Sequence, residues 1–288
     1  MKCLKLIFIS TILCIGLLSC SETNSDDSDF GILNPSEVYE AFDIAYGEDT
    51  DQVFDVYLPA NRTLNTKTII LVHGGGWTSG DKSDMNLYKS LLKEQLPTYA
   101  IVNINYRLAT NDTSPYPMQI NDITSVVNYL VTNQILYSIS EDIGFVGVSA
   151  GAHLSLLWSY AFDAENQTKM VGSVVGPTNF TDPAYLENID YPFFQDIINT
   201  FGVDLSIEFL EDVSPYHKVT ASAPPTIMFY GGEDPLIPTS QGTDLRNRLD
   251  ELNVINEFTL YPEEGHGWSG LNLLDTTIKL KAFIETHL

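Results

Sequence analysis

The sequence has few cysteines and few basic residues, and each shortage excludes a class of site or partner. All three cysteines, Cys3, Cys14 and Cys20, lie within the first twenty of 288 residues. The rest of the chain therefore has no disulfide, no cysteine–zinc site and no cysteine nucleophile. Lys and Arg number 14 against 38 Asp and Glu, so the formal net charge is −24. Because that charge repels phosphate backbones, we expect no nucleic-acid partner.

The sequence also lacks an apolar run long enough for a comfortable membrane span. The run at residues 6–18 follows two lysines and is typical of the apolar core of a signal peptide. It is followed by Cys20 in the letters LLSC, which resemble the lipobox of bacterial lipoproteins. The resemblance implies that residues 1–20 are a signal peptide and that Cys20 carries a lipid anchor, which places the protein in the bacterial cell envelope. An ordinary signal peptide and an uncleaved anchor helix are the alternatives.

The domain organisation follows from composition and length. Residues 21–36 open with the polar, acidic letters SETNSDDSD, which cannot build a core, so they are predicted to form a flexible tether. The same acidic tract resembles the surface-export signals of lipoproteins from Bacteroidetes-like bacteria. Both the periplasmic and the surface-exposed face of the outer membrane are therefore kept as locations. Residues 37–288 have the length of one large α/β domain, and two small domains are the alternative that length alone allows.

Strand-like and helix-like segments alternate through residues 37–288. Predicted strands cover residues 38–46, 52–58, 68–72, 100–105, 143–148, 171–175, 226–230 and 255–261. Predicted helices cover residues 84–95, 117–137, 150–162, 239–252 and 272–287. This alternation predicts an α/β fold with a mostly parallel central sheet and helices on both faces. Sites in such sheets lie beyond the carboxyl ends of the strands.

The clearest chemical motif is the pentapeptide GVSAG at residues 147–151. It lies between a predicted strand and a predicted helix, which is the setting of a nucleophile elbow. The turn is sharp, and glycine on both sides lets neighbouring chains approach closely. The motif therefore predicts Ser149 as a nucleophile, with the N–H of Ala150 directed toward the substrate oxygen. A glycine-rich structural turn is the alternative.

A second motif, HGGGW at residues 73–77, follows the predicted strand at residues 68–72. Three glycines are costly for stability but allow backbone N–H groups to face a developing oxyanion. The loop resembles the HGGG motif of the hormone-sensitive-lipase-like carboxylesterases, which have the α/β-hydrolase fold. By that resemblance, Gly75 and Gly76 form an oxyanion hole together with Ala150. A phosphate-binding loop is the alternative, although the glycine spacing does not fit one.

A nucleophilic serine needs a base, and the base needs an acid that orients it. In this fold the chain order is serine, acid, histidine. Among five histidines, His266 lies in a glycine-flanked loop after a late strand and is predicted to be the base. Asp234, in the letters GGEDP, resembles the acid of the family's loop, and Glu233 is the alternative.

The resemblance extends from about Val38 to the end of the chain. The letters NYRL at residues 105–108 belong to it, and we expect Arg107 and Asp122 to form a structural ion pair. The sequence GDK at residues 80–82 resembles the feruloyl- and acetyl-esterase-like group of gut bacteria. Residues 177–222 are rich in aromatic residues and are expected to form a small cap, whose rings either pack onto the body or line a pocket.

Together the motifs predict a serine carboxylesterase that acts through an acyl-enzyme without a metal or cofactor. The expected substrate is a small-molecule or glycan-linked ester, with acetyl or feruloyl esters of plant polysaccharide suggested by the resemblance. An arylformamidase or a prolyl-oligopeptidase-type serine peptidase would use the same catalytic groups. A lipid-anchored binding protein on an inactive hydrolase scaffold is an alternative of another class.

Overall fold

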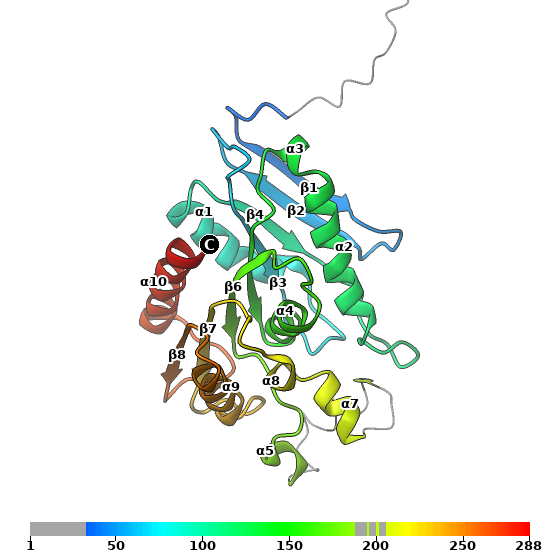
Figure 1. Cartoon of the computed structure of the whole chain (residues 1–288), viewed down its shortest axis with the longest axis vertical. Coiled ribbons are helices and arrows are strands. Elements are labelled where there is room, and N and C mark those ends of the chain that lie inside the picture. Colours follow the sequence, from blue (N-terminus) through cyan, green and yellow to red (C-terminus); the bar gives the residue numbers. More distant parts are fainter. Residues whose placement is uncertain (1–32, 188–194, 196–199, 202–205) are drawn as a thin grey trace, which may run out of the picture. The chain divides into compact units, whose positions relative to one another are not determined.

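A computed structural model describes residues 33–187, 195, 200, 201 and 206–288. At its centre is an eight-stranded sheet with the strand order β1-β2-β4-β3-β5-β6-β7-β8 (Figure 1). The strands from β4 to β8 along this order pair in parallel, whereas β2 is antiparallel to both of its neighbours. The strands are β1 (Tyr39–Ala45), β2 (Val53–Leu58), β3 (Thr68–Val72), β4 (Ala100–Ile104), β5 (Ile143–Val148), β6 (Thr168–Val174), β7 (Thr226–Gly231) and β8 (Asn256–Tyr261).

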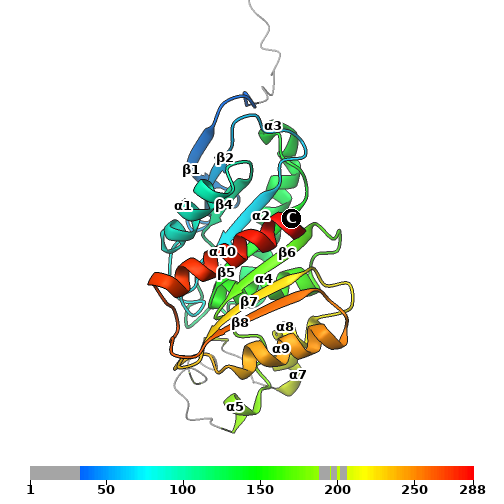
Figure 2. The same cartoon turned by 90° about the vertical axis from the view of Figure 1, so that its left-hand side faces the viewer.

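Helices cover both faces of this sheet. Helices α1 and α10 lie on one face, and α2, α4 and α9 lie on the other (Figures 1 and 2). The predicted α/β architecture is therefore confirmed. The helices are η1 (Lys82–Met85), α1 (Asn86–Gln95), α2 (Met118–Thr132), α3 (Gln134–Tyr137), α4 (Ala150–Ala161), α5 (Pro183–Leu186), α7 (Ile207–Asp212), α8 (Pro215–Lys218), α9 (Ser240–Glu251) and α10 (Gly270–His287).

Strand β3 shows why the central strands form where they do. All five of its residues are buried. Ile70 and Val72 belong to the apolar cluster on the α2 and α4 side, while Ile69 and Leu71 belong to the cluster on the α1 and α10 side. A strand buried on both faces needs a continuous apolar run rather than an alternating pattern. The letters TIILV satisfy that requirement, which fixes the strand that leads into the glycine loop.

The long helix predicted at residues 117–137 is divided in the structure. Helix α2 ends at Thr132, and Asn133 leaves helical geometry at φ −102° and ψ 12° before the short helix α3 begins. The Asn133 side-chain amide donates to the Tyr129 carbonyl at 2.8 Å. Asparagine side chains compete in this way with the helical backbone. The apolar periodicity of the sequence continues across Asn133, so it did not indicate this break.

The predicted ion pair between Arg107 and Asp122 is present. Asp122, on α2, is fully buried and accepts from Arg107 Nη2 at 2.6 Å. The same carboxylate also accepts from the Arg107 backbone N–H and from Gln52 Nε2. A buried carboxylate needs several donors of this kind. The ion pair therefore holds the segment after β4 against α2 and has a structural role.

The described part of residues 177–222 packs onto the body through its aromatic rings. Phe180, Tyr185 and Phe201 are each at most 2% exposed. Phe180 and Phe201 lie 6.0 and 5.3 Å from the ring of Trp77, which belongs to the glycine loop. These rings favour the packing role expected for the segment. Three other rings of the segment lie outside the described residues, namely those of Tyr191, Phe193 and Phe194.

The predicted leader and most of the predicted tether, residues 1–32, also lie outside the described residues. Within the described part of the chain, no helix combines the length and apolar character needed to cross a membrane.

Candidate active site

The predicted catalytic residues all follow parallel strands. The glycine loop follows β3, Ser149 follows β5, Asp234 lies after β7 and His266 lies after β8. Because these strands are parallel, their carboxyl ends share one edge of the sheet, where sites in open α/β sheets form. The structure brings Ser149, Asp234 and His266 together at that edge.

Ser149 occupies a sharp turn between β5 and α4. Its backbone has φ 53° and ψ −121°, a conformation that side-chain-bearing residues rarely adopt. Its N–H donates to the Val174 carbonyl at 2.8 Å, which ties the turn to β6. A Cβ on Gly147 would come within 2.5 Å of the Gly151 carbonyl oxygen, and one on Gly151 within 2.2 Å of the Val72 oxygen. Both glycines of the motif are therefore required by close backbone contacts.

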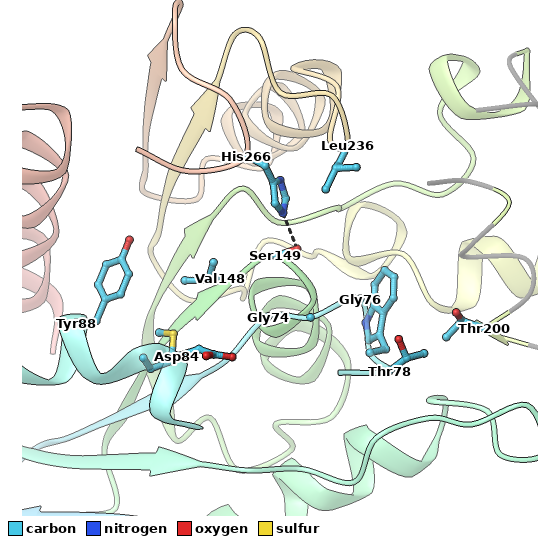
Figure 3. Close-up of a pocket in the computed structure, with 13 residues that line it drawn as sticks. Gly74, Gly76, Thr78, Asp84, Tyr88, Val148, Ser149, Thr200, Leu236 and His266 are labelled. Carbon is cyan, nitrogen blue, oxygen red and sulfur yellow. Dashed lines mark hydrogen bonds between the residues drawn. The ribbon is translucent and has the colours of Figure 1, made fainter. Parts of the chain in front are cut away.

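A chain of two hydrogen bonds joins the three residues. Ser149 Oγ lies 2.9 Å from His266 Nε2, and His266 Nδ1 lies 2.8 Å from Asp234 Oδ2 (Figure 3). With the proton on Nδ1, the ring donates to Asp234 and offers Nε2 as the acceptor for the serine hydroxyl proton. This is the arrangement of an activated serine nucleophile.

The acid on His266 is Asp234 and not Glu233. The Asp234 side chain is 1% exposed, and its Oδ1 accepts from the N–H groups of Leu236 and Ile237 at 2.8 and 3.0 Å. Its other oxygen is thereby directed at His266. Glu233 has an exposed side chain, and its N–H pairs with the Glu264 carbonyl in the histidine loop. That backbone bond draws the acid loop and the histidine loop together.

The glycine loop presents its N–H groups beside Ser149. Gly75 has φ 112° and Gly76 φ 58°, both in the region that favours glycine. A Cβ on Gly75 would collide with the Ser79 carbonyl, whereas one on Gly76 would meet no described atom within 4 Å. Neither N–H donates to an acceptor among the described residues. Ala150 is the first residue of α4, and its N–H has no partner within the helix. The predicted oxyanion donors are therefore free to bind an anion.

Sequence reasoning missed the support beneath this loop. Trp77, 1% exposed, donates from Nε1 to His153 Nδ1 at 3.2 Å, and His153 Nε2 donates to the Val213 carbonyl at 2.7 Å. The ring of His153 thus joins the glycine loop, helix α4 and the segment before α8. Its position four residues after Ser149 on a predominantly apolar helix was the available signal, because a histidine there must find buried partners.

His153 should make the protein less stable in acid. Burial lowers its pKa from 6.5 to about 4. Between pH 6.5 and 4, His153 is therefore protonated in the unfolded chain but neutral in the folded protein. The free energy of unfolding should decrease as the pH falls from 6.5 through 4, by on the order of 3 kcal/mol. Urea denaturation at several pH values measures this loss. His153→Gln cannot titrate and should show a shallower dependence, and equal slopes for both proteins would contradict the prediction. The pKa of His73 is also lowered by burial, but it contributes equally to both.

None of the other described histidines hydrogen-bonds to Ser149 Oγ. His73 is buried and stacks on Tyr106 with ring centroids 4.2 Å apart. His217 contacts Thr181, and His287 packs on Phe283 at the end of α10. Within the described part of the chain, no group of three or more His, Cys, Asp or Glu side chains could hold a metal ion.

A cavity of about 740 Å³ opens above Ser149. Figure 3 shows Asp84 and Tyr88 on one side of Ser149, and Gly76, Thr78 and Thr200 on the other. Sequence analysis did not identify Asp84 or Tyr88, which follow the glycine loop in η1 and α1. The lining residues are Gly74, Gly75, Gly76, Trp77, Thr78, Asp84, Met85, Tyr88, Val148, Ser149, Thr200, Leu236 and His266. The serine therefore faces a space large enough for a small organic ester.

Comparison with known proteins adds two findings at the level of sequence. The profile of the BD-FAE family matches residues 54–249, which is more than half of the chain. Esterase LipC of Mycobacterium tuberculosis is 26% identical over 249 residues, covering 81% of this chain and 60% of LipC. The chain thus spans about 60% of the length of that relative.

Solved structures share the fold over most of the chain. A truncated carbohydrate esterase from gut microbiota superposes with a TM-score of 0.70 at 20% identity, covering 88% of this chain and 99% of that one. An acetyl ester-xyloside bifunctional hydrolase from Caldicellulosiruptor lactoaceticus gives a TM-score of 0.69 at 16% identity, with 89% and 98% covered. The predicted fold is confirmed by these likenesses.

Proposed function

The chain belongs to the BD-FAE family, and on that premise we propose that it is a serine carboxylesterase acting through an acyl-enzyme on Ser149. The observation that carries the proposal is the hydrogen-bonded chain from Ser149 through His266 to Asp234, at 2.9 and 2.8 Å, beside free N–H groups of the glycine loop. A relative named as an esterase supports the same reaction class.

The reaction divides into two halves. Ser149 Oγ attacks the ester carbonyl carbon while its proton passes to His266 Nε2, and the N–H groups of Gly75, Gly76 and Ala150 stabilise the oxyanion. Asp234 holds the imidazole and stabilises the imidazolium. As the carbonyl reforms, the alcohol leaves with the proton from His266. Water then attacks the acyl-enzyme in the same way, which releases the acid and restores Ser149.

The proposed substrates are carbohydrate-linked esters with short or aromatic acyl groups. The support is the naming of two structural neighbours, a carbohydrate esterase and an acetyl ester-xyloside hydrolase. The cavity of about 740 Å³ accommodates an acyl group together with a sugar ring.

The test compares kcat/KM for 4-nitrophenyl acetate, acetylated xylan, methyl ferulate and a long-chain nitrophenyl ester. The proposal expects turnover of the first substrate and of one carbohydrate-type ester. A clear preference for the long-chain ester would contradict the carbohydrate assignment. N-formylkynurenine and a prolyl peptide, assayed in parallel, test the formamidase and peptidase alternatives, and faster turnover of either would replace the esterase assignment.

We also propose that the protein is lipid-anchored in the bacterial cell envelope through Cys20. The support is the lysine-led apolar run and the LLSC letters that end at Cys20. Expressed as the full chain in a bacterium, the protein should fractionate with membranes and incorporate labelled fatty acid. Cys20→Ser should lose the label and leave the membrane fraction. Labelling and membrane association that survive Cys20→Ser would contradict the anchor.

A further inference from the structure

One end of the cavity, which we term the Asp84 end, is formed by Asp84, Met85, Tyr88 and Val148. It lies on the opposite side of Ser149 from Thr78 and Thr200 (Figure 3). Met85 is 1% exposed, and together with Val148 it gives this end an apolar wall. The polar groups at this end are the carboxylate of Asp84 and the phenol hydroxyl of Tyr88. The chemistry of this end therefore depends on the state of those two groups.

The Asp84 carboxylate has no cationic partner among the described residues. Its Oδ2 accepts from the Asp81 N–H at 3.0 Å, which caps η1 and fixes the side chain. The nearby Lys82 pairs instead with Asp43 and Asp55, at 2.8 and 2.9 Å. None of the described lining residues is Lys or Arg. The negative charge of Asp84 is thus left uncompensated at the surface of the cavity.

Tyr88 provides the second polar group. Its hydroxyl forms no hydrogen bond with the described residues. Burial raises its pKa to about 12, so the group stays neutral and can donate or accept at neutral pH. A neutral ligand with hydroxyl groups can therefore donate to Asp84 and place its apolar side on Met85 and Val148, and Tyr88 adds no charge to this end.

We propose that the Asp84 end receives an uncharged portion of the ester, such as a neutral sugar, and excludes portions that carry a carboxylate. The inference rests on the proposed esterase function and specifies its substrate class. Two like charges about 4 Å apart repel by enough to change binding about five-fold even in bulk water. The net charge of −24 adds to this repulsion of anionic esters. Neutral sugar esters should thus be preferred over uronate-bearing ones.

The experiment uses two pairs of esters in which one member carries a carboxylate and the other carries its uncharged methyl ester. The first pair, 4-acetoxybenzoate and its methyl ester, carries the charge on the alcohol portion. The second pair, mono-4-nitrophenyl succinate and its methyl ester, carries it on the acyl portion. For each pair, the ratio of kcat/KM for the charged ester to that for the neutral ester is measured in the wild type and in Asp84→Asn. Asparagine retains an oxygen that can accept from the Asp81 N–H, so the cap of η1 is preserved.

Asp84→Asn should raise the ratio at least about five-fold for one of the two pairs. The pair that responds identifies whether the alcohol or the acyl portion occupies the Asp84 end, and either supports the inference. Raising the ionic strength from 0.01 to 0.2 M should raise the same ratio in the wild type more than in Asp84→Asn, because salt screens the repulsion.

The matched control is Glu141→Gln, which removes one unit of negative charge from an exposed residue just before β5, at the opposite end of that strand from Ser149. Its ratios should equal those of the wild type. If Asp84→Asn changes neither ratio more than Glu141→Gln does, the inference is overturned while the esterase function stands. If the wild type turns over none of the neutral esters, the proposed function fails first, and the inference fails with it.

Discussion

Ser149→Ala is expected to lower kcat on 4-nitrophenyl acetate by about 10⁴- to 10⁶-fold. The alanine has no Oγ, so no acyl-enzyme can form, and His266 Nε2 loses the group it would deprotonate at 2.9 Å. The residual rate would come from substrate binding and the oxyanion donors alone. Steady-state kinetics on purified protein measures the effect.

The control for Ser149→Ala is the folded state. Replacing the serine removes one hydroxyl from an 8% exposed side chain and leaves the backbone turn in place, so the thermal unfolding midpoint should change little. A fluorophosphonate probe should label the wild type and not the variant. A folded variant that retains activity would refute Ser149 as the nucleophile. A wild type that fails both to react with the probe and to hydrolyse esters would favour the alternative of an inactive binding protein.

Asp234→Asn is expected to lower kcat by about 10⁴-fold, because asparagine holds the imidazole in the wrong tautomer. Its side-chain amide would donate to His266 Nδ1 and place the histidine proton on Nε2. That nitrogen then faces Ser149 Oγ as a donor and cannot accept the hydroxyl proton. The shape of the site is kept, because the asparagine oxygen can still accept from the N–H groups of Leu236 and Ile237.

Glu233→Gln is the matched control for Asp234→Asn, since it makes the same chemical change in the adjacent residue. The Glu233 side chain is exposed and its backbone bond to Glu264 is unaffected, so kcat should stay within a few-fold of the wild type. A loss confined to Glu233→Gln, with Asp234→Asn fully active, would reverse the assignment of the acid. Comparing the two kcat values is sufficient.

The fold was predictable where the sequence pattern and the burial agree. The letters TIILV are apolar at every position because β3 is buried on both faces, and the predicted strand has the same bounds as the observed one. The break at Asn133 was not predictable from periodicity, because the apolar positions continue across it. It depends on a side-chain amide that bonds to a carbonyl one turn earlier.

The parts of the candidate site that could be predicted are those where the backbone geometry requires a particular residue type. Positions 147 and 151 require glycine, because a Cβ at either would come within 2.5 Å of a backbone carbonyl oxygen, so the motif itself carries the geometry. The residues that shape the cavity belong to no recognisable sequence motif. Asp84 and Tyr88 resemble ordinary polar helix residues in the sequence, and only the packing of η1 against β3 and β4 and of α1 against β4 places them in the cavity with Ser149. Specificity was therefore less predictable than reaction type.

The order of the strands along the chain has a consequence for folding. The nucleophile and the glycine loop follow β5 and β3, but the acid and the base follow β7 and β8, which come latest in the chain among the described strands. Strand β8 pairs only with β7, at the edge of the sheet. The serine thus has no base until edge strand β8 has docked. In a refolding experiment, the return of ester hydrolysis would therefore report the docking of β8, whereas the helical signal would sum over helices on both sides of that strand in the chain, including α10.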